Sequence, residues 1–145
     1  MDFKVAVEFS PKELRAIKKK LTDVSRPLVT FTKEKTDAMK RQFKEGKDPY
    51  GKPWKPLKQS TIDSKKQNKD KILVHRGNLK NSIRRKTDKL YFRIRLEEPY
   101  AIYHQLGTRK MAQREILAIT KEDTARIREL ITVFIGLKKR GRGLA

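Results

Sequence analysis

The stretch from Gly46 to Lys71 limits the fold of this chain more than any other feature of its sequence. It reads GKDPYGKPWKPLKQSTIDSKKQNKDK and has three prolines, two glycines and no sustained apolar period. This pattern predicts a long loop over residues 46–71, with one short helix that begins near Ser60. A loop of this length inside a compact domain is either functional or disordered. The regular structure must therefore come from the segments on either side of it.

The loop also carries the only tryptophan of the chain, Trp54. All of its basic residues are lysines, which repel one another, so we expect the loop to be mobile in the free subunit and to become ordered on assembly. Trp54 has two readings. It is either a lid over the protein's own core or, together with Leu57, an anchor that docks on a neighbouring subunit.

The segment before the loop predicts one strand and two helices. Residues 3–9 alternate apolar and polar side chains, as a half-buried strand does. Ser10 is the predicted N-cap of a first helix that opens with a capping box. Pro27 should interrupt that helix, because proline lacks an N–H and clashes with the preceding turn. A second helix then covers residues 28–44, and Gly46 is its stop signal.

The segment after the loop begins with a short turn or helix and continues as a predicted hairpin. Its strands are residues 82–87 and 90–98, joined at Asp88 and Lys89. The second strand alternates, and four of its residues are expected to face the core: Leu90, Phe92, Ile94 and Leu96.

This hairpin would place Arg84 across from Arg93, with Arg95 further along the same face. Like charges directly opposed across strands are destabilising. An anion or an acidic partner would offset that cost, so one reading is that the three arginines face DNA or a neighbouring subunit. The other reading is an ordinary solvated face, where the arginine stems cover the sheet.

The last third of the chain predicts a helix over residues 100–106 ended by Gly107, a strand over residues 114–119, and a final helix. Thr120 and Asp123 form a capping-box-like start for that final helix. The basic residues 138–145 read as a flexible tail. The expected fold is one α+β domain over residues 1–137, in which a small antiparallel sheet packs against helices.

The charge balance narrows the range of partners. There are 38 lysines and arginines against 17 aspartates and glutamates, a formal net charge of +21. A field of that sign attracts polyanions, of which nucleic acid is the natural example. The chain has no cysteine, which excludes disulfide and thiolate metal sites. No apolar run is long enough for a membrane span, and the N-terminus does not have the layout of a signal peptide.

No set of residues predicts catalysis or a metal site. Ser82, His104 and Asp123 could form a triad on paper, but no nucleophile-elbow motif surrounds the serine. The two histidines lack the paired spacing of zinc ligands. Glu97 and Glu98 are adjacent on a strand, so they point to opposite faces and do not suit a two-metal nuclease. We therefore expect no cofactor, and a structural His104 that hydrogen-bonds backbone at its helix end.

Three motifs resemble those of the phage virion morphogenesis family, the tail-completion proteins of Mu-like and P2-like bacteriophages. The first runs from Gly46 to Leu57 and the second from Ile72 to Ile83, while the third runs from Tyr100 to Arg114. The residues that carry the resemblance are Gly46, Asp48, Pro49, Gly51, Pro53, Trp54, Leu57, Gly77, Leu79, Ser82, Tyr100, His104, Gln105, Gly107 and Arg114.

The resemblance implies a structural protein rather than an enzyme. It implies a subunit that acts in tail completion or head–tail joining, as a ring around the DNA channel, with a hexamer as the family-like arrangement. The expected partners are other copies of the chain, tail-tube and head-connector proteins and, without sequence specificity, phage DNA. The protein would be assembled in the bacterial cytoplasm and end in the tail or neck of the virion. The alternative is a basic nucleic-acid-binding protein that acts alone.

Overall fold

The computed structural model describes residues 2–3, 11–12, 15, 18 and 20–136. The predicted strand over residues 3–9, the helix at Ser10 and the basic tail therefore lie largely or wholly outside the described residues. The elements in chain order are β1 (Asp2–Phe3), α2 (Ser25–Glu45), α3 (Gln59–Ser64), α4 (Asn78–Asn81), β2 (Ile83–Thr87), β3 (Phe92–Leu96), α5 (Ala101–Leu106) and α6 (Lys121–Phe134). Together they form the small α+β fold that the sequence predicts.

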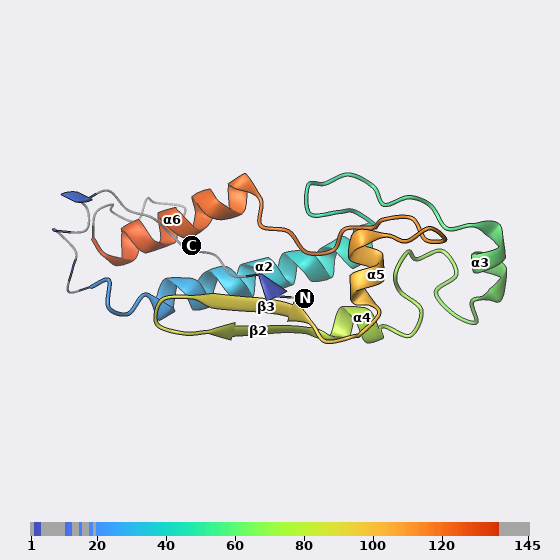
Figure 1. The fold of residues 1–145 in the computed structure, drawn as a ribbon, viewed down its shortest axis with the longest axis horizontal. Helices are drawn as coiled ribbons and strands as arrows, with labels where there is room; N and C mark the ends of the chain where they lie inside the picture. The colour runs from blue at the N-terminus through green and yellow to red at the C-terminus, as the bar shows by residue number, and fades with distance from the viewer. Residues whose placement is uncertain (1, 4–10, 13–14, 16–17, 19, 137–145) are drawn as a thin grey trace.

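The long helix α2 is the axis of the molecule (Figure 1). The β2–β3 hairpin lies along one side of it and α6 along the other, and α2 contacts all three. The helix ends at Gly46 as predicted, but it begins at Ser25 and so includes Pro27 instead of starting after it. Pro27 lies in its first turn, where a missing N–H costs little.

The core of the molecule lies between these layers. Phe31 of α2 packs on Phe92 of β3 with ring centroids 5.2 Å apart, and Met39 is fully buried about two turns further along α2. On the opposite side, Ile127 and Ile131 of α6 are each 1% exposed. The apolar side chains that recur along α2, β3 and α6 therefore pack into one shared core.

The hairpin forms, but its register differs from the prediction by two residues. Thr87 pairs with Phe92, and the N–H of Asp88 donates to the carbonyl of Tyr91, so four residues form the turn instead of two. Leu90 therefore lies in the turn and is 63% exposed, which corrects its predicted place in the core. The two residues of β1 pair with the other edge of β3.

The helix α6 begins with the predicted capping box. The N–H of Asp123 donates to Thr120 Oγ1, and the N–H of Thr120 donates to Asp123 Oδ2. The same carboxylate oxygen accepts a hydrogen bond from the ammonium group of Lys35, which is buried on α2. This ion pair joins the start of α6 to the middle of α2, and the sequence reading missed it.

The loop after α2 is fixed to the core at its first half. Trp54 is 5% exposed, stacks edge-on against Phe43 and donates its indole N–H to the carbonyl of Glu115. The interpretation of Trp54 as a lid over the protein's own core is confirmed, and an anchor on a neighbouring subunit, formed with Leu57, stays a prediction. These contacts hold Trp54 against the core, while the mobility of the loop stays a prediction. The short helix near Ser60 forms as α3.

The predicted strand over residues 114–119 is not a strand, although its centre is buried. Side-chain amides take the place of a neighbouring strand. Gln105 Oε1 accepts hydrogen bonds from the N–H groups of Ile116 and Leu117, and its Nε2 donates to the carbonyl of Leu117. Gln42 Nε2 donates to the carbonyl of Ile116. Buried backbone must find partners, and here two glutamines supply them. None of the described helices is long and apolar enough to cross a membrane.

Candidate functional site

The three sequence motifs meet at one end of the molecule, where α3, α4 and α5 lie together (Figure 1). There they surround a pocket of about 970 Å³ that opens to solvent. Each motif contributes to its wall: the first Leu57, the second Leu79, and the third His104 and Arg114. A volume of this size lies in the range of small-ligand and peptide side-chain sites.

The first motif forms a tight turn before it reaches the pocket. Asp48 Oδ1 accepts hydrogen bonds from the N–H groups of Tyr50 and Lys52, in a turn that contains Pro49 and Gly51. Pro53 bridges back to Lys47, and Trp54 then enters the core. The turn thus directs the chain from the end of α2 to the mouth of the pocket.

Arg114 of the third motif holds the next part of the first motif. Its guanidinium donates to the carbonyls of Lys55 at 2.9 Å and Pro56 at 3.1 Å, far away in sequence. Burial lowers the pKa of Arg114, although a guanidinium remains charged at any physiological pH. The side chain therefore builds one wall of the pocket and keeps its charge there.

Lys65 builds the opposite wall, and nothing in the sequence singled it out. It is 8% exposed, and its ammonium group donates to three backbone carbonyls, those of Asn68, Lys71 and Val74. Burial lowers its pKa, against the opposing influence of Asp70. One buried lysine thus closes the loop between α3 and α4, a role that depends on which carbonyls the fold brings together.

The second motif supplies the floor of the pocket. Leu79 is 3% exposed on α4, and Ser82 donates its hydroxyl to the Leu79 carbonyl. Gly77 precedes α4 as its N-cap residue.

Gly107 sets the path of the third motif after α5. Its φ of +74° lies where residues with a side chain are strained. A Cβ atom at this position would also lie 2.9 Å from the backbone nitrogen of Gln113. Both constraints require glycine here, because the chain turns back on itself between Gly107 and Gln113 to place Arg114 at the pocket.

His104 lies at the pocket with one ring nitrogen buried and unsatisfied. Its ring meets Tyr100 edge-on at 6.0 Å between centroids. The sequence predicts that the side chain of His104 hydrogen-bonds backbone, but Nδ1 has no hydrogen-bond partner among the described residues. The residue contributes its backbone instead, because its carbonyl accepts a hydrogen bond from the N–H of Arg114. Burial, and then the charge of Arg114, lower the pKa of His104.

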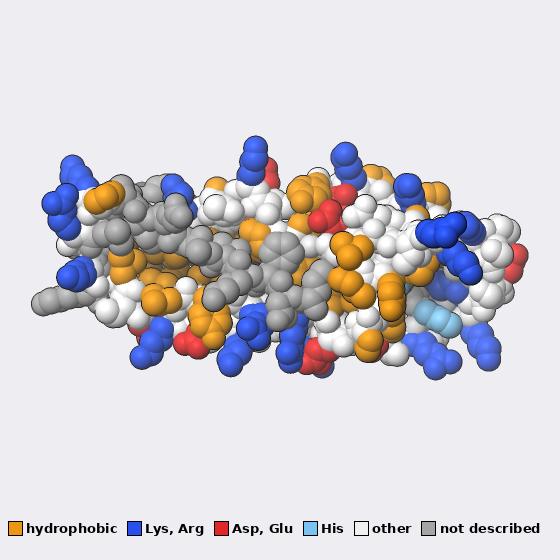
Figure 2. Space-filling view, viewed as in Figure 1, with side chains coloured by type: hydrophobic (Ala, Val, Ile, Leu, Met, Phe, Trp, Pro, Cys, Tyr) orange, Lys and Arg blue, Asp and Glu red, His pale blue; other side chains and the backbone are white. Residues whose placement is uncertain are grey.

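The charged side chains that line the pocket are all basic. Its lining includes six lysine or arginine side chains and both histidines of the chain, and no aspartate or glutamate. Lys65 and Arg114 donate their hydrogen bonds to neutral carbonyls, and the carboxylate of Asp70, which acts on Lys65, lies outside the lining. Figure 2 shows lysine, arginine and histidine side chains gathered at this end of the face in view.

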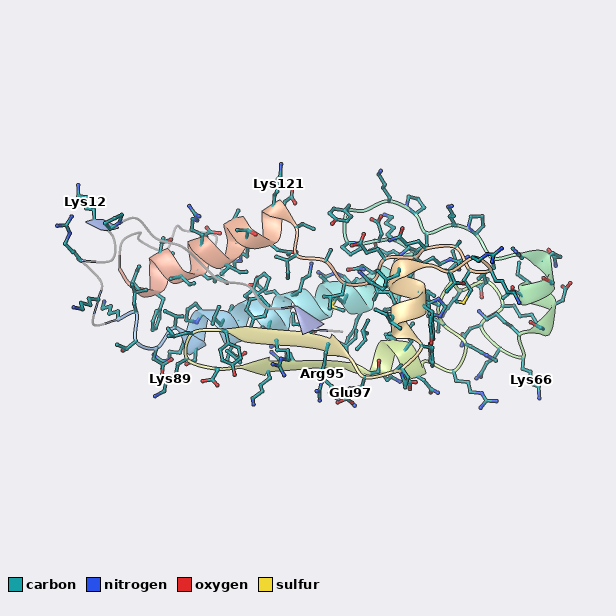
Figure 3. The ribbon with its side chains drawn as sticks, in the orientation of Figure 1. Lys12, Lys66, Lys89, Arg95, Glu97 and Lys121 are labelled. Atoms are coloured by element: carbon teal, nitrogen blue, oxygen red, sulfur yellow. The ribbon has the colours of Figure 1, made fainter. Side chains whose placement is uncertain are left out.

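The arginines of the hairpin form a separate exposed surface. The observed register places Arg84 across from Arg95, not from Arg93 as predicted, and Lys86 across from Arg93. Glu97 bridges the first pair: its carboxylate lies 3.2 Å from Arg84 Nε and 3.0 Å from Arg95 Nη2. Arg95 and Glu97 lie side by side at the end of β3 in Figure 3. The anion that offsets these two opposed arginines is therefore the protein's own.

The catalytic and metal arrangements considered from the sequence do not come together. The Ser82 hydroxyl bonds the Leu79 carbonyl, and Asp123 bonds Lys35, so neither orients His104. Within the described part of the chain, no three histidines, cysteines or acids lie close enough to hold a metal ion.

One comparison with known proteins identifies a family for this chain. Searches among curated proteins and among solved structures gave no significant match. The profile of the phage virion morphogenesis family matches residues 10–135, which include all three motifs. That family is one of virion structural proteins and not of enzymes. The chain belongs to the phage virion morphogenesis family.

Proposed function

We propose that this protein completes the phage tail or joins it to the head, as a ring of subunits around the DNA channel. The observation that carries the proposal is the family match over residues 10–135. The three motifs of the resemblance also converge on one pocket, which suits a subunit built to contact other proteins.

The charge of the chain supports a place next to DNA. A net charge of +21 destabilises a free subunit, because its positive charges repel one another. DNA phosphates in the channel would reduce this repulsion. The alternative, a nucleic-acid-binding protein that acts alone, draws on the same charge. The two differ in assembly: the first predicts self-association and binding to tail tubes, and the second a monomer that binds duplex DNA tightly.

The test is removal of the gene in the phage or prophage that encodes the chain. We expect separate heads and incomplete tails by electron microscopy, and recovery of whole particles when the gene is supplied in trans. Native mass spectrometry of the purified protein with tail tubes should then give the ring size. Normal particles without the gene would contradict the proposal, and a salt-sensitive monomer–DNA complex without self-association would favour the alternative.

We further propose that Arg84, Arg93 and Arg95 face the DNA channel or an acidic neighbouring subunit. All three side chains are exposed on the hairpin. The variant R84Q/R93Q/R95Q should fold as the wild type does, because the ion pairs with Glu97 and the Arg84 hydrogen bonds to the Asn81 and Ile83 carbonyls are exposed. Exposed ion pairs are worth about 0–1 kcal/mol each. Particles built with it should retain less DNA. Wild-type assembly and DNA content would show that this face is only solvated.

A further inference from the structure

The pocket at the α3–α5 end has both apolar and cationic side chains in its lining. Part of its wall is apolar, from Leu57, Leu73, Val74, Leu79 and Met111. The rest of the lining includes six lysine or arginine side chains and neutral polar residues, but no carboxylate. Apolar walls favour an apolar group in the pocket, and the cations favour an anionic one. A ligand that fits this lining therefore carries both kinds of group.

The walls are built to keep this shape. Lys65 donates three hydrogen bonds to backbone carbonyls and Arg114 donates two, so each side chain joins separate stretches of backbone. Asn68 adds a hydrogen bond from its side-chain nitrogen to the carbonyl of His75. The cavity is therefore held open by its own frame, as pre-formed binding sites are.

Apolar side chains are also exposed at positions of α5 that do not line the pocket. Ile102, Tyr103 and Leu106 are exposed there by 39%, 55% and 66%. Figure 2 shows hydrophobic side chains gathered over this region, next to the cationic end. Exposed apolar side chains beside a pocket are typical of sites that bind another protein.

We propose that the pocket is a docking site for an acidic segment of a different protein. Its apolar side chains would enter the cavity and rest on α5, and its carboxylates would meet the cations around the mouth. The inference does not depend on the function proposed above, since it follows from the pocket itself.

The chemistry of the pocket favours this occupant over two others. A second copy of this chain has 38 basic residues against 17 acidic ones, so its surface matches the cationic lining of this pocket less well than an acidic segment does. A nucleic acid would use the cations but would leave most of the aliphatic wall unused, because its phosphates seek exposed charges. A segment with alternating acidic and large apolar residues uses both surfaces at once.

The test uses short labelled peptides and fluorescence anisotropy with the full chain. One peptide contains leucines among aspartates and glutamates. A second replaces each leucine by serine, and a single-stranded oligonucleotide serves as the nucleic-acid probe. The rim variant is K58E/R76E/K110E, in which all three side chains are exposed and line the pocket. The matched control is K33E/K40E/R128E, with the same change in net charge on exposed positions of α2 and α6.

We expect saturable binding of the leucine peptide, weakened at least about tenfold in the rim variant and less than about twofold in the control. The serine peptide should bind at least about tenfold more weakly than the leucine peptide. Circular dichroism checks that the rim variant is folded; if it is not, K58Q/R76Q/K110Q replaces it.

Three results would overturn the proposal. Equal weakening by both triple variants would reduce the interaction to general charge attraction. Equal binding of the leucine and serine peptides would show that the apolar wall plays no part. Tighter binding of the oligonucleotide than of the leucine peptide, lost only in the rim variant, would make the pocket a nucleic-acid site.

Discussion

At the scale of single residues, His104 destabilises the fold through a buried ring nitrogen that makes no hydrogen bond to the described residues. Its Nδ1 is buried without a partner among the described residues, and Arg114 stands near enough to disfavour a second charge. An unsatisfied buried polar atom is uncommon in folded proteins and usually has a reason. Here the histidine belongs to the pocket wall, where a bound segment would meet it.

The lowered pKa of His104 gives stability a definite dependence on pH. An unfolded histidine titrates near 6.5, and the folded one takes up its proton only at lower pH. The unfolded state therefore binds more protons in this window, and the contribution of His104 to stability, present above about pH 6.5, is lost as the pH falls. Urea midpoints measured between about pH 5 and 8 should fall more steeply for wild type than for H104Q. Parallel curves for the two proteins would contradict the assignment.

Trp54 is the second residue with a measurable role. The change W54A removes the packing on Phe43 and should cost about 3–5 kcal/mol of unfolding free energy. The variant W54F keeps a ring in place and loses the hydrogen bond to Glu115, so it should cost about 1 kcal/mol from that loss. Urea unfolding followed by circular dichroism separates the two. Wild-type stability of W54A would mean that the side chain does not belong to the core.

At the scale of elements, α2 and α6 are joined by a buried charge pair as well as by apolar packing. Lys35 lies on the buried stripe of α2 between Phe31 and Met39, where an apolar residue would be expected. Its partner Asp123 also closes the capping box of α6. One carboxylate therefore sets both where α6 begins and where it meets α2.

The two partners of this pair should respond differently to substitution. D123A leaves the Lys35 ammonium buried without an acid and removes half of the capping box, and we expect a loss of about 3–5 kcal/mol. K35M leaves a carboxylate that is 19% exposed and still accepts from the Thr120 N–H, so it should cost clearly less. Chemical unfolding of both variants checks the order. A larger loss for K35M than for D123A would refute this account.

At the scale of the whole molecule, the positive charge is not confined to the pocket end and extends along an elongated body. Figure 2 shows lysines and arginines around the rim of the face in view. Repulsion among them acts over about 30 Å at 0.01 M salt and only about 10 Å at 0.1 M. The folded subunit should therefore be more sensitive to salt than most small domains.

We expect the thermal midpoint of the wild type to rise as sodium chloride is added. Screening weakens the repulsion of a +21 protein, while the few exposed ion pairs lose little. The variant K33E/K40E/R128E carries a smaller excess of charge and should gain less from the same salt. Differential scanning calorimetry across a salt series measures both. A midpoint independent of salt in the wild type would show that the charges are already neutralised within the fold.

The sequence by itself determined the elements whose signals are local. The stop at Gly46, the capping box of Thr120 and Asp123, and the alternation of Phe92, Ile94 and Leu96 each depend on neighbours a few positions away. Such patterns act through backbone hydrogen bonds and side-chain period, so they can be read in order along the chain.

The tertiary structure decided what depends on contacts between distant segments. Trp54 bonds a carbonyl 61 positions away, and Lys35 pairs with an acid 88 positions away. The observed hairpin register differs from the predicted one by two residues, because the N–H of Asp88 and the carbonyl of Tyr91 close the turn. This register also places Glu97 beside Arg84 and Arg95. The pocket exists only because Lys65 and Arg114 find carbonyls that the fold places beside them. A local pattern cannot encode these choices, since each partner becomes available only when the core has brought it near.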